Sequence, residues 1–298
     1  MKVAVFGAAG FVGQNVVDAL LEQKIAVVPS DITQQWGIYK ANLVTDFGFV
    51  EEIVRECDAV VHLAASPLGV SLKEPLENAQ VNIIGTLSLL RAMLKQNVKK
   101  IIFASASSVV GDVPQQSNSI PSISEDVVCT PKTPYAACKL AIESFLRVYH
   151  ELFGIEYLTF RFFNVYGPGQ VGGLIPAAYR TIANGKKFTI TGNGTQVRDF
   201  VYVKDVAQFI VRSLTEDCTK WNETLNMGTG IPRTVTEIVT LVAQVLGIPA
   251  QIDFDRTASG EISNYVADTT KLHHLYGAVP STSLEQGLEE TIAWLKKQ

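Results

Sequence analysis

A tyrosine and a lysine one helical turn apart are the residues best placed to move a proton. Tyr135 and Lys139 stand in the segment YAACK, which follows Thr133 and Pro134 and opens a predicted helix that runs to about Tyr149. Residues at positions i and i+4 share one helix face, so the phenol and the ammonium group can meet. A phenol near pKa 10 is a poor base at neutral pH, but a neighbouring positive charge favours the phenolate. The pair therefore predicts a tyrosine general base whose pKa falls toward the working pH.

A glycine-rich turn near the N-terminus predicts a dinucleotide site. Gly7, Gly10 and Gly13 follow a short apolar run and open a stretch with helical spacing. The first glycine makes a tight turn, the second lets the backbone approach a pyrophosphate, and the third lets the helix pack on the strand. The start of that helix would offer the N–H groups of Phe11 and Val12 to a phosphate.

A carboxylate at the end of the second predicted strand indicates which dinucleotide is bound. Asp31 stands 18 residues after Gly13. A carboxylate at this place accepts hydrogen bonds from ribose hydroxyls and repels a 2′-phosphate. We therefore expect the cofactor to be NAD rather than NADP.

Composition and charge narrow the classes of protein. The 298 residues are 47% hydrophobic and 18% charged, as in ordinary globular chains. The net charge of −4 gives no broad cationic field, so no nucleic-acid partner is expected. No apolar run is long enough for a membrane span. Cys57, Cys129, Cys138 and Cys218 are widely spaced, which indicates reduced thiols in a cytoplasmic protein, and no metal site is expected.

Short apolar strands alternate with amphipathic helices in the first half of the chain. This order predicts an α/β fold, a Rossmann-type doubly wound parallel sheet with helices on both faces. The strands are expected at 3–6, 25–28, 59–63, 101–104 and 158–163, with a helix at 83–94.

The character of the sequence changes after residue 165, where Gly, Pro, Thr and Asn become frequent. We expect residues 1–165 to form the NAD-binding domain, to which a segment around 196–212 returns. Residues 166–298 would form a smaller α/β lobe that binds substrate, with a strand at 187–191 and helices at 235–246 and 284–295.

Several of these stretches resemble the extended short-chain dehydrogenase/reductase family. The GxxGxxG spacing is typical of that family. An HLAA segment resembles its fourth-strand motif, which implies that the backbone of Leu63, Ala64 and Ala65 passes the cofactor. The segment NIIGT resembles its NxxGT helix, in which Asn82 would hold the sheet and the site together. The resemblance also implies that the YxxxK pair contacts the cofactor, with Lys139 bonding the nicotinamide ribose.

The third catalytic group of such enzymes, a Ser or Thr hydroxyl, is missing from its usual place. The family carries it three residues before the Val of a VYG motif, and that alignment reaches Ala106, with Val110 in place of Tyr. Since side chains alternate along a strand, a replacement from Ser107, our first choice, or Ser108 needs a local bend. A water molecule or no replacement are the alternatives. Dehydratases and decarboxylases of this family carry carboxylates here, so the serines favour a nucleotide-sugar 4-epimerase.

Later segments resemble the family's substrate-binding motifs. The segment RFFNVYGPG contains Asn164, which the resemblance assigns to the sugar diphosphate. The segment RDFVYVKDV begins with Arg198, whose guanidinium suits bidentate phosphate contacts. Arg256, followed by Gly260-Glu261, resembles a modified phosphate-binding segment. Tyr265 matches a position beside the 2-substituent of the sugar, and its size favours a sugar without an N-acetyl group.

Together these features predict an NAD-dependent enzyme that inverts C4 of a nucleotide-diphosphate sugar, first of all a UDP-hexose, through a transient 4-keto intermediate. Two alternatives stay open. One is a net NAD-dependent nucleotide-sugar oxidoreductase or dehydratase, and the other, motivated by Ala106, is an NAD-binding sensor or scaffold without turnover. The resemblance also implies a homodimer that pairs the helices predicted at 82–94 and 135–149.

Overall fold

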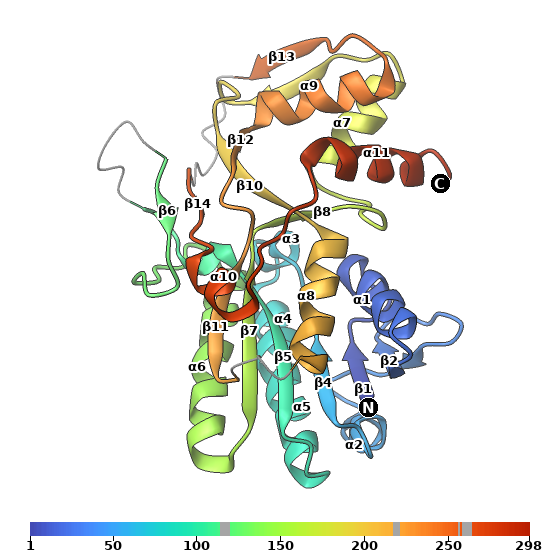
Figure 1. Ribbon diagram of the computed structural model, residues 1–298, viewed down its shortest axis with the longest axis vertical. Helices are drawn as coiled ribbons and strands as arrows, with labels where there is room; N and C mark the ends of the chain where they lie inside the picture. Colours follow the sequence, from blue (N-terminus) through green and yellow to red (C-terminus); the bar gives the residue numbers. More distant parts are fainter. Residues whose placement is uncertain (114–119, 217–220, 256, 258–263) are drawn as a thin grey trace. The chain divides into compact units, whose positions relative to one another are not determined.

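The computed structural model describes residues 1–113, 120–216, 221–255, 257 and 264–298 (Figure 1). Two compact units divide the chain. Unit 1 consists of Met1–Asp112, Asp126–Phe162 and Ala207–Leu225, and unit 2 of Val113–Glu125, Phe163–Val206 and Asn226–Gln298. The expected boundary at residue 165 lies beside the division after Phe162. The segment that returns to unit 1 begins at Ala207, whereas residues 196–206 lie in unit 2.

A seven-stranded sheet forms the centre of unit 1. Its strand order is β11-β7-β5-β4-β1-β2-β3, and the printed pairings from β7 to β3 are all parallel. Its strands are β1 (Lys2–Phe6), β2 (Ala26–Asp31), β3 (Tyr39–Lys40), β4 (Ala59–His62), β5 (Lys100–Ala106), β7 (Glu156–Phe162) and β11 (Glu223–Met227). The order reverses direction between β1 and β4, which is where an open α/β sheet forms its ligand crevice.

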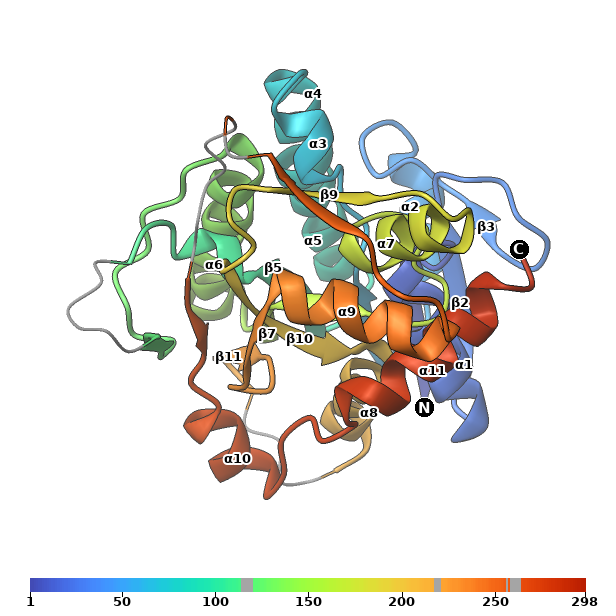
Figure 2. The ribbon, with the colours of Figure 1, turned by 90° about the horizontal axis from the view of Figure 1, so that it is seen from above.

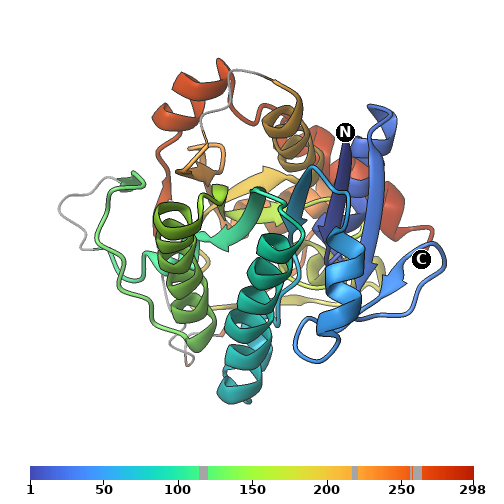
Figure 3. The same cartoon turned by 90° about the horizontal axis from the view of Figure 1, so that it is seen from below.

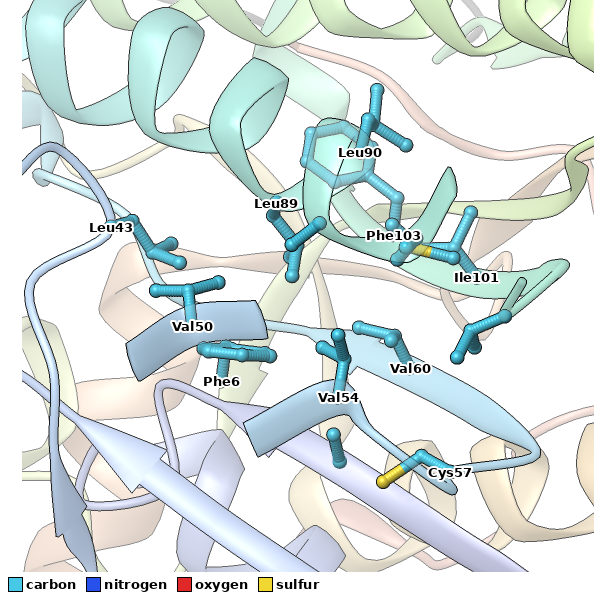
Figure 4. Close-up of a cluster of buried hydrophobic side chains, with 14 of the residues drawn as sticks. Phe6, Leu43, Val50, Val54, Cys57, Val60, Leu89, Leu90, Ile101 and Phe103 are labelled. Atoms are coloured by element: carbon cyan, nitrogen blue, oxygen red, sulfur yellow. The ribbon is translucent and has the colours of Figure 1, made fainter. Parts of the chain in front are cut away.

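Alternation along the strands sends their side chains to opposite faces. Phe6, Val60 and Phe103 join one buried cluster with residues of the flanking helices (Figure 4). The neighbouring Val5 and Val61 are equally buried but lie outside that cluster. Since successive side chains in a strand point to opposite faces, both faces of this sheet are covered.

The helices of unit 1 follow the strands in βαβ order. They are α1 (Phe11–Glu22), α2 (Phe47–Val54), α3 (Leu68–Ser71), α4 (Pro75–Ala79), α5 (Gly85–Lys95) and α6 (Pro134–Phe153), while α8 (Val203–Thr215) starts in the unit 2 segment and continues in unit 1. Figure 3 shows the α5 and α6 helices side by side. The helix expected at 83–94 is longer, because the π-turn η1 (Gln80–Ile84) joins α4 to α5. A π-turn holds one extra residue per turn, which the 3.6-residue pattern does not reveal.

The described part of unit 2 contains small sheets and helices. The sheets are β12-β10-β8 (Pro232–Thr234, Val197–Tyr202, Asn164–Tyr166), β13-β9 (Ile252–Asp255, Phe188–Thr191) and β14-β6 (Val266–Ala267, Ser122–Ile123). The helices are α7 (Leu174–Ala183), α9 (Val235–Leu246), α10 (Thr270–Tyr276) and α11 (Leu284–Leu295). In Figure 2, α9 lies beside α11, and apolar residues of α7, α9 and α11 form one buried cluster with Tyr166.

Among the described residues, no helix is long and apolar enough to cross a membrane. Within the same ranges, no group of three His, Cys, Asp or Glu side chains could hold a metal ion. Cys57, Cys129 and Cys138 are free thiols, and Cys218 lies outside the described residues.

Candidate active site

Helix α6 begins where the sequence predicts and presents the tyrosine and lysine on one face. Thr133 is the N-cap, and its side chain accepts a hydrogen bond of 3.2 Å from the N–H of Ala136. Pro134 takes the first helical position, where its missing N–H costs nothing. Tyr135 and Lys139 therefore lie one turn apart at the start of a well-capped helix.

Lys139 is buried against strand β5. Its Nζ donates a 2.7 Å hydrogen bond to the Ala104 carbonyl oxygen, and its side chain is only 3% exposed. The ammonium lies 4.8 Å from the ring centre of Phe103 and 5.7 Å from that of Tyr135. Burial lowers the pKa of Lys139 to about 8. The lysine is thus a charged group held at the edge of deprotonation near neutral pH.

The pKa of Tyr135 is not lowered by Lys139 alone, and its expected fall rests on the positive charge of a bound nicotinamide as well. Burial raises the pKa of Tyr135 to about 12. The Lys139 ammonium bonds the Ala104 carbonyl, and its ring contact with Tyr135 does not offset the loss of water around the phenol. Phenolate formation at neutral pH therefore requires further positive charge beside this tyrosine.

The strand that should carry the third hydroxyl ends at Ala106. Ser107 and Ser108 lie in a 3₁₀ turn, η2 (Ser107–Val109), so the alternation of a strand does not decide where they point. The local bend required for a substitute hydroxyl is therefore present. The Oγ atom of Ser108 is buried and has no hydrogen-bond partner within the described part of the chain. Ser105 is engaged elsewhere, because its Oγ donates to Glu143 Oε1 at 2.5 Å.

The glycine turn is shaped by close backbone contacts. Gly7 has φ +87°, and a Cβ there would lie 2.5 Å from the backbone nitrogen of Ala64. A Cβ on Gly13 would collide with the carbonyl oxygen of Gly7. Helix α1 has no side-chain cap, so its first N–H groups, from Phe11 and Val12 onward, point out of the helix end toward any bound anion.

Asp31 is held in place by the same turn. Its Oδ2 accepts from the N–H of Ala9 at 3.1 Å, and its Oδ1 accepts from the N–H of Thr33 at 2.9 Å. Each carboxylate oxygen keeps a further lone pair for another donor, such as a ribose hydroxyl.

A cavity of about 750 Å³ opens over the carboxyl ends of β1, β2 and β4. Its walls include six of the twelve predicted cofactor residues and several residues that sequence reasoning missed, while Phe11, Val12, Gly13, Asn82, Tyr135 and Lys139 do not line it. The predicted residues are Gly7, Gly10, Asp31, Leu63, Ala64 and Ala65, and the missed ones include Leu43, Val44, Thr45, Gln80 and Val81. A cavity of this size at the topological switch point suits a dinucleotide. In this loop the Asn42 Oδ1 accepts a hydrogen bond from the N–H of Val44.

Asn82 and His62 brace the chain beneath this cavity. Asn82 Oδ1 accepts from the N–H of Ser66 at 2.8 Å, and its Nδ2 donates to the Ser66 oxygen at 3.0 Å. The hydroxyl of Thr86 donates its one proton to the Asn82 carbonyl. The same hydroxyl oxygen must therefore accept a hydrogen bond from His62 Nε2, which means that the ring proton of His62 is on Nε2. Burial lowers the pKa of His62 to about 3, and its ring is therefore neutral.

The predicted substrate residues lie in unit 2 and are described within that unit. Asn164 Nδ2 donates to the backbone carbonyl oxygen of Asp199 at 3.1 Å, and Arg198 Nη1 donates to the backbone carbonyl oxygen of Val197 at 2.8 Å. Burial lowers the pKa of Arg198, while Tyr265 acts in the opposite direction. Tyr265 is buried and meets the Phe163 ring edge-on at 6.0 Å. Arg256 and the Gly260-Glu261 pair lie outside the described residues.

Asp199 is a buried carboxylate that sequence reasoning did not single out. Its carboxylate is fully buried and accepts four hydrogen bonds, from the N–H and Oγ1 of Thr229, the N–H of Gly230 and the N–H of Ala267. It stands next to Arg198 in β10, so it fixes the strand that presents the guanidinium.

The model of the NAD dependent epimerase/dehydratase family matches residues 3–228. The chain belongs to this family. The predicted family, the enzymatic class and the cofactor NAD are thereby confirmed. The UDP-glucuronate 4-epimerase of Thermodesulfobacterium geofontis is 31% identical, over 98% of this chain and 95% of its own length. The UDP-N-acetyl-alpha-D-glucosaminuronate decarboxylase of Bacillus cytotoxicus is 29% identical, over 99% and 98%.

A solved structure shows the same fold. The UDP-glucose 4-epimerase of Thermotoga maritima with UDP-glucose superposes with a TM-score of 0.91 at 30% identity, covering 100% of this chain and 99% of that one. The expected Rossmann-type sheet with a second α/β lobe is confirmed.

Proposed function

We propose that this family member is an epimerase that inverts C4 of a nucleotide-diphosphate sugar, with a UDP-hexose as the first candidate, through a transient 4-keto sugar. The observation that carries the proposal is the pair of Tyr135 and Lys139 at the start of α6, beside a turn that holds Ser107 and Ser108 and no carboxylate. Dehydration or decarboxylation would need an acid at that turn, whereas epimerisation needs a base for one hydroxyl.

NAD fits the cavity of unit 1, because the glycine turn leaves no room for side chains and Asp31 retains acceptor capacity beside it. Gly7, Gly10, Phe11, Val12, Gly13, Asp31, Leu63, Ala64 and Ala65 would hold it, with Asn82 bracing the chain at Ser66. When bound, NAD supplies a hydride acceptor and, once reduced, a donor.

The residues of the chain supply the proton chemistry. Tyr135 takes the proton of the C4 hydroxyl and returns it after the keto sugar has turned over, while Lys139 keeps a positive charge beside the phenol. The positive charge of the nicotinamide is the further charge that the high pKa of Tyr135 calls for. Ser107 or Ser108 would share the proton of the C4 hydroxyl, in place of the side-chain hydroxyl that Ala106 lacks.

We assign substrate binding to Asn164, Arg198, Arg256 and Tyr265. Arg198 would hold the diphosphate through its guanidinium, and Asn164 would bond it as well. The bulk of Tyr265 favours a sugar without an N-acetyl group. An anchored diphosphate leaves the sugar free to rotate between hydride removal and return.

The test is to incubate the purified chain with UDP-glucose, UDP-galactose, UDP-glucuronate and UDP-N-acetylglucosamine, and to separate the products by chromatography. We expect interconversion of C4 epimers with no net reduction of NAD. A stoichiometric rise in NADH absorbance, loss of water or release of carbon dioxide would favour an oxidoreductase, dehydratase or decarboxylase instead.

Ala106 favours one second candidate, an NAD-binding sensor or scaffold without turnover. Full NAD occupancy with no conversion of any nucleotide sugar would support it. The observation against it is that both Tyr135 and Lys139 are present, with the Lys139 ammonium 5.7 Å from the centre of the Tyr135 ring.

We also propose a cytoplasmic homodimer. The free thiols suit a reducing compartment. Helices α4 to α6 expose Leu76, Ile84, Val148 and Leu152, with Leu152 67% exposed, which suits pairing of these helices with a second copy. Sedimentation equilibrium would give twice the mass of the chain if this holds, and the mass of one chain if it does not.

A further inference from the structure

A buried polar cluster ties helix α6 to strand β5 at two successive residues. The Ala104 carbonyl accepts from Lys139 Nζ at 2.7 Å, and the Ser105 hydroxyl donates to Glu143 Oε1 at 2.5 Å. Lys139 and Glu143 are one turn apart on α6, and Ser105 and Glu143 are 2% and 3% exposed. The two bonds together fix both the height and the rotation of the helix against the strand.

The neighbouring strand completes the cluster. Arg161 on β7 pairs in register with Ser105 on β5. Its Nε donates to Glu143 Oε1 at 3.1 Å and its Nη2 to Oε2 at 2.8 Å, and the arginine is 5% exposed. A bidentate guanidinium–carboxylate pair has a fixed planar geometry, so it is more specific in position than an apolar contact.

A buried ion pair is poor evidence of a purely stabilising role. Apolar residues of similar volume often give equal or greater stability, because removing two charges from water is costly. Helix α6 already packs through Ile142 and Leu146, which are fully buried. The ion pair is therefore better explained by what its geometry does for the residue one turn earlier.

We propose that Glu143 is a positioning residue: held by Arg161 and Ser105, it fixes α6 against β5 and β7 so that the Lys139 ammonium stays on the Ala104 carbonyl. The role of Lys139 in turnover rests on the proposed function, but the position and charge of the lysine do not.

The charges felt at Lys139 come from two elements. Glu143 and Cys138 on α6 raise its pKa against the effect of burial, and Lys139 in turn lowers the pKa of His62 on β4, which is neutral. Arg161 forms an ion pair with Glu143 and offsets its negative charge. We therefore expect removal of Glu143 to lower the pKa of Lys139 and removal of Arg161 to raise it.

The first measurement is the pKa of Lys139 by NMR of the full chain carrying isotope-labelled lysine, with the signal assigned by its absence from Lys139→Met. We expect about 8 in the wild type, a value below the wild type in Glu143→Gln, and a value above the wild type in Arg161→Met. Loss of packing alone would admit water and raise the pKa in both variants. A rise in both, or no change in Glu143→Gln, would overturn the proposal.

The second measurement is the pH profile of turnover. In Glu143→Gln, the alkaline limb should move to lower pH in parallel with the NMR value, and kcat should fall more than KM rises, since substrate residues are untouched. Glu143→Asp keeps the charge and should restore the wild-type limb in part. Thr159→Val on β7 is the matched control, because the Thr159 hydroxyl is buried without a hydrogen-bond partner within the described residues.

The two proposals fail separately. If no nucleotide sugar is converted but the opposite shifts at Lys139 are seen, the positioning role stands and the proposed function falls. If Glu143→Gln does not fold, as circular dichroism would show, the double variant Glu143→Gln/Arg161→Met removes both charges together. The pKa of Lys139 in the double variant should then lie below that in Arg161→Met, because the double variant also lacks the Glu143 charge, and an equal or higher value would contradict the proposal.

Discussion

Replacing Lys139 with methionine removes a buried charge and keeps the volume of the side chain. Lys139 is 3% exposed, and within the described residues its ammonium donates to the Ala104 carbonyl. Burial lowers its pKa from the ordinary 10.5 to about 8. The unfolded chain therefore holds this proton more tightly than the folded chain does, and the wild type should gain stability over Lys139→Met as the pH rises.

The size of that gain follows from the two pKa values. Below pH 8 Lys139 is charged in both the folded and the unfolded state, so burying its ammonium costs the full amount, about 3 kcal/mol of folding free energy. At about pH 10 the folded state has lost the proton and the unfolded state is losing it, so about 1 kcal/mol remains. The cost disappears above 10.5. The hydrogen bond to the Ala104 carbonyl weakens when Lys139 loses its proton, and this change is already contained in the pKa of the folded state.

The assay is chemical denaturation of both proteins at about pH 7, 8, 9 and 10, with unfolding free energies obtained by linear extrapolation. The difference between wild type and Lys139→Met should move by about 2–3 kcal/mol in favour of the wild type across this series. Lys187→Met, an exposed lysine, is the control and should show a constant difference. A constant difference for Lys139→Met, or one that moves against the wild type, would refute the reasoning.

Four further predictions concern the glycine turn, the 3₁₀ turn at Ser107 and unit 2. Gly13→Ala should weaken NAD binding at least about tenfold by fluorescence titration, because its Cβ meets the Gly7 oxygen, whereas Gly48→Ala, with open space around its Cβ, should bind normally. Asp31→Ser should lose about tenfold in NAD affinity and gain affinity for NADP, and an unchanged preference would contradict the role of the carboxylate. Ala106→Ser should change kcat less than about threefold if Ser107 or Ser108 already supplies the hydroxyl, and a gain above tenfold would show that neither does. Asp199→Asn should cost about 2–4 kcal/mol in denaturation, because an amide places donors against N–H groups, while the exposed Asp18→Asn should cost little.

The features that could be predicted from the sequence are those set by local spacing. The glycine turn, Asp31 at the end of β2 and the capped start of α6 are all written in a few adjacent residues. The helices at 235–246 and 284–295 were predicted to the residue, because Thr234 and Ser283 are caps and the apolar period is regular.

The rest depends on contacts between residues far apart in the chain. The pKa of Tyr135 is set by burial, which no sequence pattern measures. The π-helical turn around Asn82 occurs where Asn82 forms a hydrogen bond with Ser66. The bend at Ser107 occurs where β5 ends and is not marked by a typical turn residue. The Ser105–Glu143–Arg161 cluster joins three elements, and in the sequence its members look like ordinary polar residues.

The carboxylate of Asp199 has a consequence for the order in which the protein becomes complete during synthesis. Its four donors belong to Thr229, Gly230 and Ala267, so β10 leaves the ribosome well before they do. At about 5–20 residues per second, on the order of several seconds pass between translation of Asp199 and of Ala267. Until then the carboxylate lacks the hydrogen bond from Ala267, and unit 2 is incomplete around it. A nascent chain halted before Ala267 should therefore remain sensitive to protease at β10, whichever part of unit 1 has already folded.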